Sequence, residues 1–190
     1  MANFTMLENQ FNEIVSPKIT QFLQINTNQD KEFIGNSIQG LVSETLFGMR
    51  QNALSDLGKY VNRNIICYYS TWLHNTNPAS PNPELIINDN DINGFMNAVS
   101  MRDKTKGLDL ILQTPGGVTT ATESIVKYLR KIFNNDIRVI VPHMAMSAGT
   151  MIACAAKEII MGKESSLGPI DPQYKNVPAE GVLAEFSKAI

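Results

Sequence analysis

Two motifs decide the fold of this chain: Thr114-Pro115-Gly116-Gly117 and Ala145-Met146-Ser147-Ala148-Gly149-Thr150. Each follows a short apolar run of strand-forming residues, 108–112 before the first motif and 137–141 before the second, and each precedes a helical pattern. Two strand-turn-helix units in tandem predict parallel strands joined by crossover helices. We therefore expect both motifs at the same carboxyl edge of one sheet, where open α/β folds place their sites.

The two motifs supply the groups that acyl transfer requires. Gly116 and Gly117 can bring backbone N–H groups close to a substrate oxygen, because they have no Cβ. Ser147 is expected at a helix start, with its hydroxyl exposed and the N–H of Ala148 pointing toward the same oxygen. The pattern predicts Ser147 as the nucleophile and an oxyanion hole made by the glycine pair and Ala148. A simple tight turn is the other interpretation of the glycines.

Three blocks of sequence carry a family resemblance: Leu110-Ile-Leu-Gln-Thr-Pro-Gly-Gly117, Val141-Pro-His-Met-Ala-Met-Ser-Ala-Gly-Thr150 and Leu167-Gly-Pro-Ile-Asp-Pro-Gln173. They resemble, in order and spacing, the serine dehydrogenase proteinase family of the Clp-protease/crotonase superfamily, which also contains signal peptide peptidase A and the NfeD-type serine proteases. The resemblance covers residues 65–184. It implies an α/β, ClpP/crotonase-like fold of repeated β-β-α units, serine peptidase activity on a peptide or protein substrate, and a homo-oligomer.

Several residues are candidates for the general base that accepts the proton of Ser147. A serine hydroxyl needs a base to become a nucleophile, and both histidines, His74 and His143, precede Ser147. The related Clp proteolytic subunit has its histidine after the serine, in the region that here reads Leu167 to Gln173. This region contains no histidine, so a close copy of that triad is excluded.

Signal peptide peptidase A and the NfeD-type relatives use a serine–lysine dyad instead, in which a desolvated lysine of lowered pKa takes the proton. Lys188 resembles the dyad lysine by its separation from Ser147 and its place on a later helix; an ordinary exposed lysine is the competing interpretation. Lys175 is the second candidate. Lys157 lies about 15 Å along the same helix and is too distant, and Lys163 is expected to be solvated in a turn.

Two other residues are candidates for supporting roles. His143 lies four residues before Ser147 at the expected strand end, and we interpret it as a turn or substrate-lining residue. Asp171 belongs to the third block, and the resemblance places it near the active edge, where it would orient the base or bind the substrate backbone. An acidic turn residue held between two prolines is the alternative interpretation of Asp171.

We expect two parts in the chain: a helical N-terminal extension, residues 1–62, and a ClpP/crotonase-like serine peptidase domain, residues 63–190. The apolar spacing predicts a helix that meets Pro17, a second stretch resuming near Ile19, and a long helix over 32–61. We expect this extension to pack on the domain or on a neighbouring subunit. A helical pattern after Ala179 reaches the last residue without a capping signal, which predicts a fragment truncated at the C-terminus or a divergent short form.

Between these parts the sequence predicts a strand at 64–73 and a short helix at 89–99, capped by Asp89 or Asp91. The run Thr120-Ala-Thr-Glu123 matches a capping box for the helix after the glycine pair, although Thr119 could cap this helix instead.

The composition is that of a soluble globular protein. The 190 residues are 43% hydrophobic and 18% charged, and a net charge of −2 gives no reason to expect nucleic acid or an anionic membrane. We expect a cytoplasmic protein with free thiols at Cys67 and Cys154, because there is no signal-peptide pattern and no apolar window of spanning length. We expect no cofactor, because no Gly-x-Gly-x-x-Gly fingerprint is present, and no metal, because no His/Cys ligand pattern is present.

Two other functions are compatible with the sequence. A crotonase-like enzyme acting on an acyl-CoA thioester would use the same glycine-built oxyanion hole, although such enzymes usually employ carboxylates where Ser147 stands. A catalytically inactive assembly subunit would explain the missing downstream histidine and the abrupt C-terminus.

Overall fold

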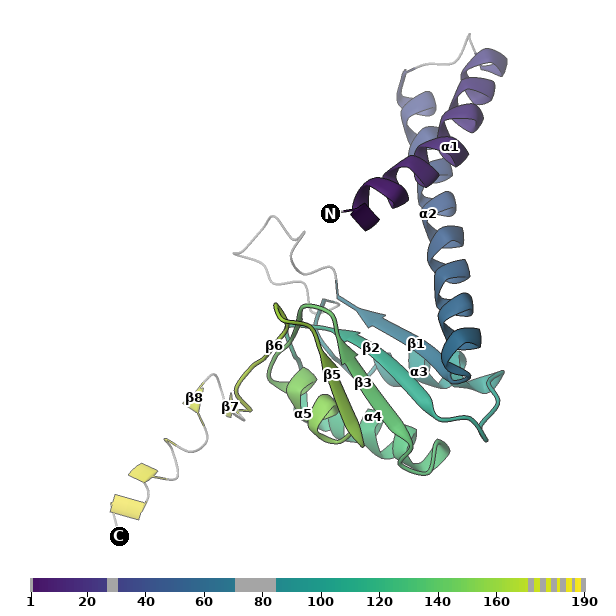
Figure 1. The fold of residues 1–190 in the computed structure, drawn as a ribbon. Helices are drawn as coiled ribbons and strands as arrows, with labels where there is room; N and C mark the ends of the chain where they lie inside the picture. The colour runs from purple at the N-terminus through teal and green to yellow at the C-terminus, as the bar shows by residue number, and fades with distance from the viewer. Residues whose placement is uncertain are drawn as a thin grey trace. The chain divides into compact units, whose positions relative to one another are not determined.

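The computed structural model describes residues 2–26, 31–70 and 85–170, together with short pieces beyond residue 170. The chain divides into two compact units, Met1–Leu57 and Gly58–Ile190, whose elements are labelled in Figure 1. The first unit is built from two helices, α1 (Ala2–Ile25) and α2 (Lys31–Val61).

Helix α1 runs without interruption through Pro17, so the predicted break at this proline is wrong. A proline inside a helix removes one backbone hydrogen bond, but packing can outweigh that loss. Val15 is 4% exposed, and the rings of Phe22 and Phe33 stack with centroids 6.5 Å apart. Val15 is therefore buried before Pro17, and Phe22 packs against α2 after it.

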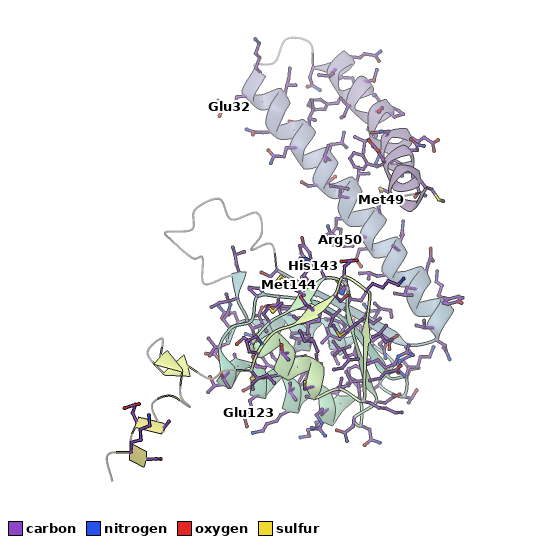
Figure 2. The ribbon with its side chains drawn as sticks, turned by 60° about the vertical axis from the view of Figure 1, so that its left-hand side comes forward. Glu32, Met49, Arg50, Glu123, His143 and Met144 are labelled. Atoms are coloured by element: carbon purple, nitrogen blue, oxygen red, sulfur yellow. The ribbon has the colours of Figure 1, made fainter. Side chains whose placement is uncertain are left out.

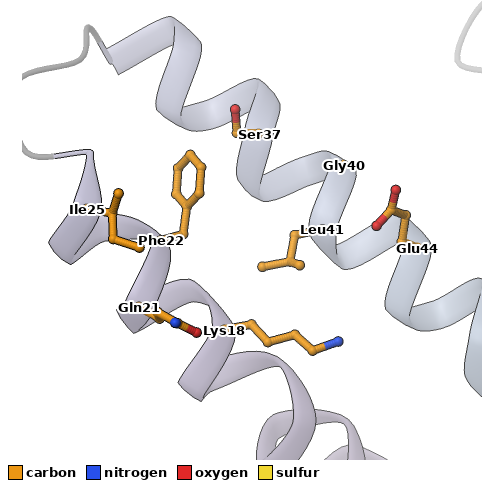
Figure 3. Close-up of a pocket in the computed structure, with 8 residues that line it drawn as sticks. All are labelled: Lys18, Gln21, Phe22, Ile25, Ser37, Gly40, Leu41 and Glu44. Atoms are coloured by element: carbon orange, nitrogen blue, oxygen red, sulfur yellow. The ribbon is translucent and has the colours of Figure 1, made fainter.

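The two helices leave a shallow groove of about 480 Å³ along their seam (Figure 3). Gly40 contributes to this space, because a Cβ added there would meet no atom within 4 Å. Apolar and charged side chains line the groove together: Lys18, Gln21, Phe22, Ile25, Ser37, Gly40, Leu41 and Glu44. Within the described residues, no helix has the length and apolar character needed to cross a membrane.

The second unit is built on a four-stranded parallel sheet with the strand order β1-β2-β3-β5. Its strands are β1 (Asn64–Tyr69), β2 (Leu108–Gln113), β3 (Ile137–Val141) and β5 (Glu158–Met161). Three helices lie side by side against it (Figure 1): α3 (Asp91–Ser100), α4 (Thr119–Ile132) and α5 (Ala148–Cys154). The predicted α/β class, with parallel strands and crossover helices, is confirmed.

The core lies between this sheet and these helices. Strand β2 is central, and Leu108, Leu110 and Leu112 are completely buried. Helix α4 places Ile125, Leu129 and Phe133 against them, as its apolar spacing predicts. The sheet and the helices thereby form a rigid base for the loops at the carboxyl ends of the strands.

Short strands follow beyond the carboxyl ends of the four main strands. Strand β4 (Met144–Ala145) pairs in parallel with β6 (Ser166–Leu167). Beyond them, β7 (Gln173–Tyr174) pairs antiparallel with β8 (Val177–Pro178).

The predicted helix caps are wrong. Asn90 precedes α3 and makes no side-chain capping bond; the Asp91 carboxylate instead accepts hydrogen bonds from the Asn88 N–H and the Tyr68 hydroxyl, at 2.8 and 3.1 Å. Burial raises the pKa of the Tyr68 phenol, and the nearby Asp91 charge raises it further. The Asp91 carboxylate, which the sequence predicted as a possible helix cap, therefore binds Tyr68 of β1 instead.

The capping box predicted at the start of α4 is also absent. Helix α4 begins at Thr119 after Val118, without a side-chain capping bond. The Glu123 carboxylate instead forms an ion pair with Lys127, one turn further along, at 2.6 Å. Glu123 therefore pairs with Lys127 on the exposed surface of the helix and not with the backbone at the start of α4.

A buried charge cluster lies at the amino-terminal end of the sheet, opposite the motifs. The Asp109 side chain is 1% exposed and lies between two arginines: Arg63 Nε is 2.5 Å from its Oδ1, and Arg138 Nη2 is 2.5 Å from its Oδ2. Arg63 also donates to Asp136 at 2.9 Å. Burial alone would raise the pKa of Asp109, but the hydrogen bonds from Arg138 and Arg63 lower it overall. The cluster joins β2 and β3 to Arg63, the residue that precedes β1.

Candidate active site

The two motifs meet through a backbone bridge. The Thr114 N–H donates to the Met144 carbonyl at 3.1 Å, and the Met146 N–H donates to the Thr114 carbonyl at 3.0 Å. Thr114 follows β2 directly and Met144 opens β4, so the bridge joins two loops that are 30 residues apart in sequence. The turn at Gly116 and Gly117 (the glycine turn) and the turn at Ser147 (the serine turn) consequently lie next to each other.

The close approach of the two turns explains why residue 116 is glycine. Gly116 has φ +110°, a conformation that other residues rarely adopt. A Cβ added at this position would lie 2.8 Å from the Met146 carbonyl oxygen and 2.9 Å from the Ser147 Cβ. The backbone of residue 116 therefore packs directly against the serine, with no room for a side chain between them.

The hydrogen bonds of the glycine turn distinguish its two N–H groups. The Gly116 N–H donates to the Thr114 hydroxyl at 3.1 Å. The Ile87 N–H donates to the Gly116 carbonyl at 2.9 Å, and in a trans peptide the following N–H points the opposite way. The Gly117 N–H therefore points away from Ile87, and no described residue accepts a hydrogen bond from it. Among the described residues, the Gly116 N–H has an acceptor and the Gly117 N–H has none.

Ser147 itself has a strained backbone. It precedes α5 with φ 50° and ψ −114°, a region that is costly for any residue with a Cβ. Among the described residues, its hydroxyl has no hydrogen-bond partner. The Gly149 N–H donates to the Met146 carbonyl at 2.8 Å, whereas the Ala148 N–H has no described acceptor. A strained serine beside two available N–H groups, those of Gly117 and Ala148, is an arrangement suited to acyl transfer.

The third sequence block begins beside the serine turn. The Thr150 hydroxyl lies 2.7 Å from the Ala145 carbonyl, and it accepts a hydrogen bond from the Gly168 N–H at 3.1 Å. It thereby links β4, which leads to Ser147, to the segment that follows β6. Thr114 and Thr150 belong to the two motifs, but the sequence pattern predicted no role for either residue. Asp171, further along this block, lies outside the described residues.

No described base contacts Ser147. Lys188 is 74% exposed, and its ammonium group donates to the Glu185 carboxylate at 3.2 Å, one turn earlier on the same short helical segment. Lys157 follows the far end of α5, where it pairs with Asp136 at 3.7 Å. Lys163 is exposed, and Lys175 lies outside the described residues.

The histidines are likewise not in contact with Ser147 in the described part of the chain. His143 is exposed in the loop that leaves β3, next to Met144 (Figure 2). Its carbonyl accepts the Ser166 N–H at 2.8 Å, so its backbone holds β6 in place. His74 lies outside the described residues. The described residues also contain no group of three or more His, Cys, Asp or Glu side chains that could hold a metal ion.

Replacing Gly116 with alanine is expected to lower the free energy of unfolding by about 2 kcal/mol or more, because of strain at positive φ and overlap with the Ser147 turn. Gly94→Ala, in α3, is the matched control, because its Cβ would meet no atom within 4 Å. This control is expected to be slightly stabilising, by about 0.5–1 kcal/mol. Urea unfolding measures both, and equal stabilities would contradict the close approach of the two turns.

Comparison with known proteins identifies the family of this chain. Residues 83–189 match the family model described as ClpP-like SDH-type serine proteinase, and the chain belongs to this family. The fold is thus that of a family of serine proteinases.

Two uncharacterized proteins of Methanocaldococcus jannaschii are similar to this chain. One is 45% identical over 93 residues, which are 49% of this chain and 32% of that protein. The other is 40% identical over 96 residues, which are 50% of this chain and 32% of that protein. The chain thus spans about a third of the length of these curated relatives.

Proposed function

We propose that this chain is a serine peptidase that hydrolyses peptide bonds with Ser147 as its nucleophile. The observation that carries the proposal is the strained Ser147 backbone next to the Gly116–Gly117 turn, with the N–H groups of Gly117 and Ala148 available. Membership of a serine proteinase family supports it. In this proposal residues 63–190 are the peptidase domain and residues 1–62 a helical extension.

The proposed reaction begins when the Ser147 Oγ attacks the carbonyl carbon of the substrate and gives its proton to a base. The negative charge that develops on the carbonyl oxygen is stabilised by the N–H groups of Gly117 and Ala148. The tetrahedral intermediate collapses, the C–N bond breaks, and the protonated base gives its proton to the leaving amine. Water then hydrolyses the acyl-serine by the same steps and restores the hydroxyl.

Lys188 is our proposed base, in a Ser–Lys dyad, with Lys175 as the second candidate. A lysine acts as a base near neutral pH only when burial lowers its pKa. The Lys188 ammonium group is exposed and pairs with Glu185, so it must leave this partner and become desolvated beside Ser147. His143 and Asp171 are proposed to line or orient the substrate.

The remaining proposals concern the location, assembly, substrate and cofactor of the protein. We propose a cytoplasmic homo-oligomer that acts on peptide or protein substrates without a cofactor. A catalytically inactive assembly subunit is the second candidate function, and the observation that favours it is the exposure of Lys188. The two candidates differ in whether the Ser147 hydroxyl is activated.

A fluorophosphonate probe tests this difference. An activated serine displaces the fluoride and forms a stable phosphonyl ester, so the native chain is expected to gain one adduct that peptide mass spectrometry places on Ser147. The chain unfolded in urea is the control and should gain none, because the tertiary arrangement is lost. A native chain without an adduct on Ser147 would reject the peptidase proposal and favour the inactive subunit.

A further inference from the structure

Thr114 is a completely buried polar residue at the contact between the two turns. Its main chain forms the bridge to Met144 and Met146. Its hydroxyl oxygen lies 3.1 Å from the Gly116 nitrogen, whose N–H it accepts, and 3.4 Å from the Gly116 carbonyl oxygen. Valine has the same shape without the hydroxyl, so packing by itself does not require threonine at this position.

The two branches of the Thr114 side chain make different contacts. A Cβ added to Gly149 would lie 2.5 Å from the Thr114 Cγ2, so the methyl group packs against the first turn of α5. The hydroxyl contacts only the glycine turn among the described residues. Packing and hydrogen bonding by Thr114 can therefore be removed separately.

The Thr114 hydroxyl holds the glycine turn at the Gly116 N–H, while the Ile87 N–H holds it at the Gly116 carbonyl. Gly116 and Gly117 have no Cβ, so steric exclusion restricts their φ and ψ angles little. The Gly116 N–H would lack a partner without the hydroxyl, and a buried N–H without a partner favours rotation of the turn toward another acceptor. Such a rotation would also turn the Gly116–Gly117 peptide, and with it the Gly117 N–H.

We propose that Thr114 is a positioning residue of the oxyanion hole, whose hydroxyl holds the glycine turn so that the Gly117 N–H faces the oxygen of the substrate bound at Ser147. This inference rests on the peptidase function proposed above. Loss of an oxyanion donor itself slows such enzymes about 10²–10³-fold. Loss of the positioning hydroxyl leaves the donor present but misaligned, so we expect a smaller effect, about tenfold.

The test compares the rate at which a fluorophosphonate labels Ser147 in the 190-residue chain and in three variants. Thr114→Val removes the hydroxyl and keeps the shape, and it is expected to be labelled about tenfold more slowly. Thr114→Ser keeps the hydroxyl and removes the methyl group, and it is expected to retain most of the rate. Thr119→Val, at the exposed start of α4, is the control for a threonine-to-valine change and should match the unmodified chain. All rates are measured below the unfolding temperature of each variant.

The outcomes separate this inference from the function on which it rests. If the unmodified chain is labelled and Thr114→Val is labelled equally fast, the positioning role is rejected while the peptidase function stands. A Thr114→Ser variant at least as slow as Thr114→Val would show that packing against Gly149 matters, and would also overturn it. If the unmodified chain is not labelled, both proposals fail together.

A second measurement does not depend on the folding of Thr114→Val. Amide hydrogen exchange of the unmodified chain, followed by NMR, is expected to show a protected Gly116 N–H and a faster-exchanging Gly117 N–H. Equal exchange of the two amides would overturn the proposed geometry of the turn.

Discussion

Ser147→Ala is expected to abolish peptide hydrolysis, with a loss on the order of 10⁶ in kcat, the size of effect that removal of a serine nucleophile has in other serine proteases. The variant keeps the glycine turn and both available N–H groups, but it has no oxygen that can attack the substrate. Hydrolysis of a fluorogenic peptide library measures the loss. Ser124→Ala is the matched control: Ser124 is exposed on α4, where its hydroxyl donates to the Thr120 carbonyl, and its removal should leave the rate unchanged.

The strained backbone at Ser147 is also expected to affect stability. At φ 50° and ψ −114°, serine and alanine are both strained, whereas glycine is not. Ser147→Gly is therefore expected to be about 1 kcal/mol more stable to urea than Ser147→Ala, since relief of strain exceeds the extra unfolded-state entropy of glycine. Both variants should be inactive. A glycine variant less stable than the alanine variant would show that the nucleophile turn is not strained.

Asp109→Asn is expected to lower the free energy of unfolding by about 3 kcal/mol, because it removes the buried anion that the partly buried Arg63 and Arg138 share. The Asp109 carboxylate is 1% exposed and binds Arg63 and Arg138 together. Glu123→Gln is the control, because it breaks the exposed Glu123–Lys127 ion pair and should have no measurable effect. Urea unfolding near neutral pH compares them; equal effects of the two variants would contradict a stabilising role for the cluster.

The charge cluster also predicts how stability depends on acid. The pKa of Asp109 is lower in the folded chain than its ordinary value, since the hydrogen bonds from Arg138 and Arg63 outweigh the effect of burial. A carboxyl of this kind stabilises the fold fully above its unfolded pKa of about 4, and that contribution is lost as pH falls through the folded pKa. The stability difference between the unmodified chain and Asp109→Asn should therefore shrink below about pH 4. A constant difference between pH 7 and pH 3 would contradict this linkage.

Local patterns in the sequence determined the framework of the second unit. Apolar runs of five residues followed by helical spacing are sufficient to predict parallel strands with crossover helices, because each element must bury one apolar face. The same patterns placed the Thr114-Pro115-Gly116-Gly117 turn and Ser147 after neighbouring strands β2 and β3. Short-range sequence therefore determined the fold class and which two turns are close together.

Only the tertiary structure decided how the groups within those turns are used. The Gly116 N–H is occupied by the Thr114 hydroxyl, and the Gly117 N–H is directed by the bond between Ile87 and Gly116. Asp91 and Glu123 matched helix-cap patterns but bind Tyr68 and Lys127 instead. A hydrogen-bonding group takes the partner that the fold brings nearest, and that partner can be far away in sequence. Sequence patterns thus predict where the elements lie, whereas contacts across the fold decide which donors remain available for chemistry.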